Sequence, residues 1–195
     1  MRQSVLLSGV VVAGIIGVIA GTWFERTRAA SSTATIAWRM QTATDRDDRI
    51  AAVGELSRRK DRNALLPLIA TATMDLEAQV RKAAAVALGG YRSADAVPAL
   101  VALLYDESIE VRTTAAMALG SLGRCSIEEL RPVYLSGHPV ACLFAAISLS
   151  RIDDRRVEQI FAEGAKSDSP EVRKWAEQLG GQPEADLAVK TVLAQ

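Results

Sequence analysis

A repeat with a period of 31 residues constrains the fold of this 195-residue chain more than any other feature. Pro67 and Pro98 are 31 residues apart, and the same offset separates Asp75 from Asp106. An alanine-rich run follows each aspartate, and a Leu-Gly pair ends each run. The two runs and the two pairs are also related by the offset of 31 residues. Self-similarity at this period is typical of chains built from stacked supersecondary units, none of which buries its apolar face alone.

Weaker copies flank the two clear ones. Upstream, residues 49–56 (RIAAVGEL) match the alanine-rich run. Downstream, residues 138–151 repeat it, and a last copy covers residues 168–180. The chain therefore contains about five units, of which the second and third are the sharpest.

Each unit predicts two helices. The first carries proline in its opening turn, where the missing N–H costs nothing. The second opens with Asp or Ser and acidic residues, and its closing glycine suits a C-cap. In the second helix of the third unit, apolar and small residues recur at helical spacing: Val111, Thr114, Ala115, Ala118, Leu119 and Leu122. We expect an all-α solenoid over residues 45–180, preceded by a linker or first helix (25–44) and followed by a capping segment (181–195).

The third unit also carries a family resemblance. Residues 95–123 (DAVPALVALLYDESIEVRTTAAMALGSLG) resemble the short HEAT repeats of phycobilisome-lyase-like proteins, and the resemblance covers roughly residues 45–180. It implies that an aspartate at the turn between the two helices and an arginine six residues later bond along the stack. The matching pairs are Asp75 with Arg81 and Asp106 with Arg112. In the last unit Asp168 and Arg173 are five apart, and the first and fourth units lack the pair.

The segment before the repeats predicts a membrane anchor. Residues 5–24 contain no charge, and as a helix they would extend about 30 Å, enough to cross a bilayer. Arginines and a tryptophan stand at its boundaries: Arg2, Trp23, Arg26 and Arg28. A stripe of small residues suits contact with another membrane helix: Ala13, Gly17 and Gly21. We predict a single-pass protein, of a bacterial inner membrane.

Two properties of this segment stay open. Residues 18–20 (VIA) would also suit a signal-peptide cleavage site, although the apolar run continues past them and favours a retained anchor. The short leading tail favours export of the body to the periplasm, whereas Arg26 and Arg28 favour the opposite orientation. The sequence leans only slightly towards export.

The balanced charge and the small number of cysteine and histidine residues argue against several functions. Basic and acidic residues balance at 23 each, which gives no argument for nucleic-acid binding. The two cysteines and one histidine have no metal-ligand spacing, so we expect no metal and no cofactor. His138 and Cys142 are four apart and could share a helix face, but Cys142 takes the core position of Val80 and Val111. We expect Cys125 and Cys142 to be free, buried thiols, about 10 Å apart along the hairpin axis.

The second helices of a solenoid line its inner surface, which such proteins use for binding. The predicted partner-binding residues are Gln79, Lys82 and Val86 in the second unit and Glu110, Thr113 and Met117 in the third. The sequence thus predicts a non-enzymatic scaffold, an accessory subunit of an integral membrane complex. Two alternatives remain, a lyase-like subunit or chaperone for chromophore attachment, and a free membrane-tethered peptide adaptor.

Overall fold

The computed structural model describes residues 32–180, which form five helical hairpins and contain no strand. The first helices of the hairpins are α2 (Thr33–Thr42), α4 (Leu65–Met74), α6 (Val97–Ala102), α8 (Ile127–Leu135) and α10 (Arg155–Gly164). The second helices are α3 (Arg46–Arg59), α5 (Ala78–Tyr91), α7 (Ile109–Leu122), α9 (Pro139–Ser150) and α11 (Pro170–Leu179). A 3-10 turn, Leu103–Tyr105, extends α6.

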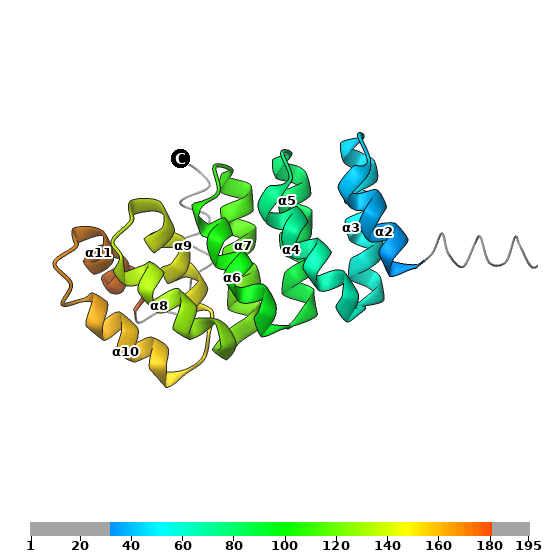
Figure 1. Cartoon of the computed structure of the whole chain (residues 1–195). Coiled ribbons are helices and arrows are strands. Elements are labelled where there is room, and N and C mark those ends of the chain that lie inside the picture. Colours follow the sequence, from blue (N-terminus) through cyan, green and yellow to red (C-terminus); the bar gives the residue numbers. More distant parts are fainter. Residues whose placement is uncertain (1–31, 181–195) are drawn as a thin grey trace, which may run out of the picture.

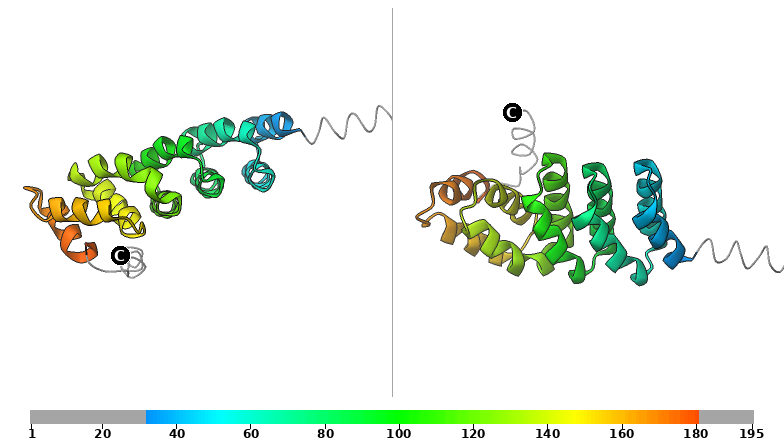
Figure 2. Two further views of the ribbon diagram at one scale, coloured as in Figure 1. Left: turned by 90° about the horizontal axis from the view of Figure 1, so that it is seen from below. Right: turned by 45° about the horizontal axis from the view of Figure 1, so that its top comes forward.

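The hairpins stack side by side into an arc (Figure 1). Seen from below, the first helices form an outer row, and α3, α5 and α7 form an inner row (Figure 2, left). Each of α5 and α7 packs against the second helices on both sides and against the first helix of its own hairpin. The all-α solenoid predicted from the repeat is therefore the observed architecture of the described residues.

Side-chain caps set where most of the second helices begin. Asp45, His138 and Ser169 each accept a hydrogen bond from a backbone N–H in the first turn of the helix that follows. Such caps satisfy donors that the helix itself leaves unpaired. The N-cap residue occupies an equivalent position in every hairpin, including Glu77 before α5 and Ser108 before α7, whose side chains make no such bond.

In the second and third hairpins the Leu-Gly pairs do not end the second helices, contrary to the prediction, whereas in the last hairpin α11 ends at Leu179 with Gly180 as its C-cap. Helix α5 continues past Gly89 to Tyr91 and ends at Arg92, which has a left-handed φ of 50°. A Cβ at Gly89 would lie 2.9 Å from the Cβ of Ala118. Glycine is therefore needed there because α5 and α7 approach closely, and not because the helix ends.

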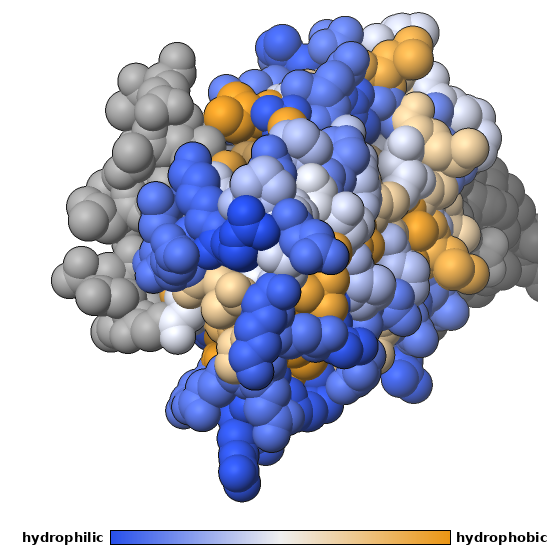
Figure 3. All heavy atoms as spheres, turned by 90° about the vertical axis from the view of Figure 1, so that its left-hand side faces the viewer, coloured by the Kyte–Doolittle hydropathy of each residue, from blue (hydrophilic) through white to orange (hydrophobic). Residues whose placement is uncertain are grey.

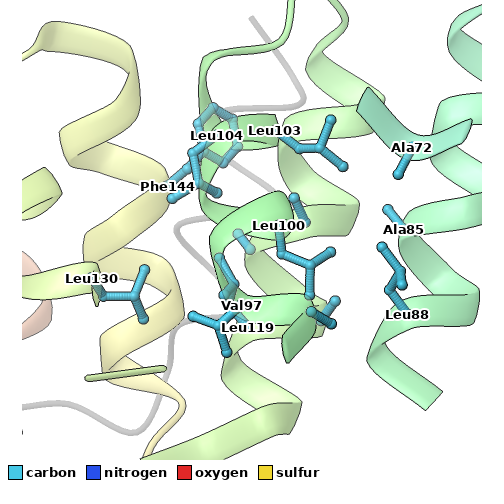
Figure 4. Packing of buried hydrophobic residues seen from close by; sticks show 14 of the residues in the cluster. Ala72, Ala85, Leu88, Val97, Leu100, Leu103, Leu104, Leu119, Leu130 and Phe144 are labelled. Carbon is cyan, nitrogen blue, oxygen red and sulfur yellow. The ribbon is translucent and has the colours of Figure 1, made fainter. Parts of the chain in front are cut away.

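One apolar core runs through the whole stack. Leu88, Leu100 and Leu119 are fully buried. Figure 4 shows Leu88 and Leu100 between the second and third hairpins with Ala72 and Ala85, and Leu119 on the side of the third hairpin that faces Leu130 of the fourth. Alanine on the facing second helices lets their backbones approach, while leucine fills the space between the two rows. Every hairpin contributes to this core, so neighbouring hairpins stabilise one another.

The stack begins at α2, before the boundary expected at residue 45. Helix α2 packs on α3, and its Ile36 and Met40 are buried. Residues 25–44 were expected to form either a linker or a first helix, and residues 33–42 form a first helix. The predicted anchor (5–24), with Ala13, Gly17 and Gly21, lies outside the described residues, as does segment 181–195. Within residues 32–180, no helix has the length and apolar character to span a bilayer.

Candidate interaction surface

Arginines join consecutive hairpins at the turns between first and second helices, and we call these turns the turn edge (43–45, 75–77, 106–108, 136–138 and 165–169). Arg81 donates from Nε and Nη2 to the two carboxylate oxygens of Asp106 in the next hairpin, at 2.8 and 2.9 Å. Its Nη1 donates to the carbonyls of Asp75 and Leu76 in its own turn. The arginine therefore bonds sideways to the next aspartate and meets only the backbone of the aspartate six residues before it.

The first hairpin takes part in the same ladder, which the sequence analysis missed. Arg49 donates to both carboxylate oxygens of Asp75, at 2.9 and 3.1 Å, and to the carbonyl of Ala43 six residues earlier. Arg49 and Arg81 are 32 residues apart, not 31, so the constant offset concealed the match. Measured from the N-cap the two arginines are equivalent, since each lies four residues after it.

The ladder stops after the third hairpin. Arg112 still donates from Nη1 to the carbonyls of Asp106 and Glu107. The residue equivalent to Asp106 in the next turn is Ser136, whose hydroxyl accepts from the amide of His138 as Asp106 accepts from Ser108. The predicted pair of Asp106 with Arg112 is thus a contact to the backbone only, and no carboxylate of the next turn faces Arg112.

The last hairpin repeats only the backbone part of this pattern. Arg173 donates from Nη1 to the carbonyl of Ser167, six residues earlier. Ser167, and not Asp168, therefore takes the position of Asp75 and Asp106, which explains the spacing of five in the sequence.

The Arg81–Asp106 pair is shielded from solvent, with side chains only 8% and 7% exposed. Burial acts to raise the pKa of Asp106, but hydrogen bonds from Arg81 and from the Ser108 amide outweigh it, so the pKa lies below its usual value. The hydrogen bond to Asp106 raises the pKa of Arg81. Both groups are therefore charged at neutral pH and fix the second hairpin against the third.

The predicted partner-binding residues lie on α5 and α7, and we call this surface the inner face. Val86 is 60% exposed and Met117 47% exposed, at equivalent positions of adjacent helices. Beside them Lys82 bonds to Glu110 across the two helices at 2.7 Å, and Gln79 bonds to the same carboxylate at 3.2 Å. The Lys82 hydrogen bond, followed by that of Gln79, lowers the pKa of Glu110.

Thr113, the sixth predicted residue, donates to the carbonyl of Ile109 one turn earlier in α7. The inner face thus consists of two exposed apolar side chains beside polar residues that are held in place by hydrogen bonds between α5 and α7. On α9 the surface does not continue, because every residue from Ala141 to Leu149 is buried.

The cysteines are separate and chemically different. Both are free thiols and Cys142 is buried, as predicted, but Cys125 is exposed, contrary to the prediction, because it lies in the connection between α7 and α8 rather than inside a helix. Burial raises the pKa of Cys142 to about 11, with a smaller contribution from Glu171. Counted from its N-cap, His138, Cys142 takes the position of Arg112 rather than that of Val111 as predicted, because the connection between α7 and α8 is one residue shorter than that between α5 and α6.

His138 does not activate this thiol. Its Nδ1 accepts a hydrogen bond from the Ala141 amide, and its ring packs edge-on against Tyr105 with centroids 5.1 Å apart. A thiol with a raised pKa is protonated at neutral pH and is a poor nucleophile. Residues 32–180 also contain no group of His, Cys, Asp and Glu side chains that would hold a metal ion.

One stack of hairpins, with its first helices in an outer row, its second helices in an inner row and an unbroken core between them, defines an α-solenoid, a class of repeat proteins that bind partners along their inner surfaces. Models of HEAT repeats match residues 33–120 and 65–139, which together span more than half of the chain. The chain belongs to the HEAT-repeat family. No curated protein matches it.

Proposed function

We propose that this protein is a scaffold that holds a partner protein on its inner face, as an accessory subunit of a membrane complex. Residues 5–24 would supply the single-pass anchor, and residues 33–180 the binding body. HEAT repeats generally mediate contacts between proteins, which supports the general role. The membrane complex rests on the apolar run in the sequence.

The observation that carries the proposal is the pair Val86 and Met117. Both side chains are exposed, although most apolar side chains of α5 and α7 are buried. Together they offer an apolar contact whose methionine adapts to irregular partner surfaces. The Lys82–Glu110 bridge keeps the border polar, as in protein interfaces with an apolar centre and a charged rim.

The lyase-like alternative is less well supported. Thiol-based attachment of a chromophore needs an accessible thiolate, but Cys142 is buried and its pKa is raised to about 11. Cys125 is accessible but lies in the α7–α8 connection, at the opposite end of its hairpin from His138.

A co-purification experiment tests the scaffold. The full chain would be purified from native membranes in mild detergent, and proteins present in fixed ratio identified by mass spectrometry. The doubly substituted variant Val86→Glu/Met117→Glu should lose the partner, because a buried unpaired carboxylate opposes binding. Leu66→Glu, on the first helix α4, is the control and should retain it.

The outcomes separate the remaining possibilities. A fixed set of integral membrane proteins, lost only in the double variant, supports the accessory subunit. Soluble peptides or proteins in place of membrane subunits would favour the free adaptor. A partner retained by the double variant would show that the inner face is not the binding surface.

A further inference from the structure

The inner side of α9 differs in composition from the inner sides of α5 and α7. With the N-cap residue counted as zero, the residues of the inner face occupy positions 2, 5 and 9 of α5 and of α7. In both helices the first two of these positions are polar and only the third is apolar. On α9 all three are apolar, and we call them the α9 strip: Val140, Leu143 and Ile147.

Most of the α9 strip is buried, unlike the same positions on the other two helices. Ile147 is 1% exposed and Leu143 is 8% exposed, whereas the equivalents of Ile147, Val86 and Met117, are both exposed. Among the described helices α9 has the same three kinds of neighbour as α7, namely the second helix on either side and the first helix of its own hairpin. Those three neighbours leave the inner side of α7 open. Cover on the α9 strip therefore has to come from a segment outside residues 32–180.

The described chain ends close to this strip. All second helices begin at the turn edge, so α11 ends at the opposite edge of the stack, where α9 also ends. The two helices pack against each other, and packed helices are about 8–10 Å apart. Residues 181–183 extend over about 10 Å, which is enough to lead the chain from Gly180 to the end of α9.

Residues 184–194 have the pattern and the length that the strip requires. As a helix they would extend about 16 Å, against about 18 Å for the 12 residues of α9. Such a helix would be amphipathic, with Leu187 and Thr191 on the side opposite its apolar face. The residues of the apolar face are small or apolar: Ala185, Ala188, Val189, Val192 and Leu193.

We propose that residues 184–194 dock along the inner side of α9 and close the partner-binding surface of this protein at α7. Their apolar face contacts the α9 strip, and the first acidic residues, Glu184 and Asp186, lie near the positive charge of Arg151 at the C-cap of α9. The segment thus covers an inner side of the stack and not its open end. A partner on α5 and α7 extends to α9 only by displacing it. The docking does not depend on whether the inner face binds a partner.

Cysteine accessibility in the full chain, in mild detergent, tests the proposal. In a Cys125→Ser background, which removes the exposed native thiol, Ile147→Cys places a reporter on the strip and the buried Cys142 sets the background rate. We expect a water-soluble maleimide to label position 147 about tenfold faster in a chain ending at Gly180, because the apolar cover is lost. Leu143→Cys serves as a second reporter if the first variant does not fold.

A matched reporter and matched variants of the segment are the controls. Met117→Cys should be labelled quickly in both chains, since that position is already exposed. Val189→Asp/Val192→Asp places two charges on the apolar face and should speed labelling at position 147 as the deletion does. Leu187→Asp/Thr191→Asp adds the same charge on the opposite face and should leave that labelling slow.

Three results would overturn the proposal. Slow labelling of position 147 in the chain ending at Gly180 would show that the described helices cover the strip themselves. Equal acceleration by the two double variants would show that the apolar face is not what docks. The full chain would also be labelled at decreasing concentration. A constant rate supports docking within one chain, whereas acceleration on dilution would mean that a second copy supplies the segment.

Discussion

Arg81 and Arg112 hold the same backbone atoms of their own turns, yet their opposite edges meet different groups. Arg81 binds a buried carboxylate, whereas Arg112 lies over an aromatic ring. Removing one partner of a buried ion pair leaves the other charge uncompensated, which is much more harmful than removing an arginine without a carboxylate partner. The two positions therefore form a matched pair for mutagenesis.

We expect Arg81→Met to lower the free energy of unfolding by about 3–5 kcal/mol, because Asp106 would remain buried without its partner. Arg112→Met should lower it by about 1–2 kcal/mol, through loss of the aromatic contact and of two bonds to turn carbonyls. Urea titrations followed by circular dichroism measure both values. Equal losses would contradict the distinction drawn between the two junctions.

Asp106 also predicts a pH dependence. Its pKa in the folded chain is lowered, so its contribution to stability is complete above the ordinary carboxyl pKa of about 4 and disappears as the pH falls through the lower folded value. Asp106→Asn should be less stable than wild type at neutral pH, and the difference should shrink on acidification below about pH 4. Unfolding titrations across this range provide the measurement, and a constant difference would refute the linkage.

At the scale of helices, two adjacent glycines of α5 have opposite surroundings. A Cβ at Gly89 would meet the Cβ and Cα of Ala118 at 2.9 and 3.2 Å, whereas nothing lies within 4 Å of a Cβ at Gly90. The first contact involves the backbone of α7, which moves only if the helices separate. Close packing between the inner helices therefore depends on Gly89 and not on Gly90.

Gly89→Ala should consequently destabilise the protein by about 1–3 kcal/mol through overpacking. Gly90→Ala should stabilise it by about 0.5–1 kcal/mol, because alanine has the higher helix propensity. Thermal unfolding of the two variants beside wild type would test the pair. A stabilising Gly89→Ala would show that α5 and α7 have room to spare.

The hairpins followed from the sequence because proline, aspartate and alanine recur with a fixed offset. Two details did not follow, since each depends on a change of one residue in the length of a first helix or of a connection between hairpins. Arg49 was hidden by an offset of 32, and Cys142 shifted to the arginine position because the connection between α7 and α8 is shorter. Counting from the N-cap residues, rather than along the chain, would have found both.

Helix α2 and the end of α5 were harder to predict. The pair Ile36 and Met40, four apart, was a signal for the buried face of a first helix, but no proline or aspartate of the repeat accompanies it. The glycine of the Leu-Gly pair has two uses in helices, as a cap or as a point of close approach. Only the position of Ala118 on the neighbouring helix decides between them.

At the scale of the whole molecule, the last hairpin covers the apolar side of the fourth. Tyr134 is fully buried, packs edge-on against Phe161 and donates to the carbonyl of Val172. The end of the stack that faces the viewer in Figure 3 is mostly hydrophilic, with apolar atoms in small patches. A polar outer surface on the terminal repeat is what keeps a solenoid soluble.

A chain that ends at Ser150 should therefore aggregate, because α8 and α9 would lose the hairpin formed by α10 and α11. A chain that ends at Gly180 keeps that hairpin and is the control. Size-exclusion chromatography in the same detergent distinguishes them. If both elute as the full chain does, the last hairpin is not required to cover the fourth.

The contrast between the two thiols makes the native protein a reporter of its own topology. A maleimide that cannot cross membranes will react with the exposed Cys125 and leave the buried Cys142 unmodified, so no cysteine has to be added or removed. If the body is exported, cells with a permeabilised outer envelope will be labelled at this one site. If it faces the cytoplasm, labelling will begin only when the inner membrane is opened.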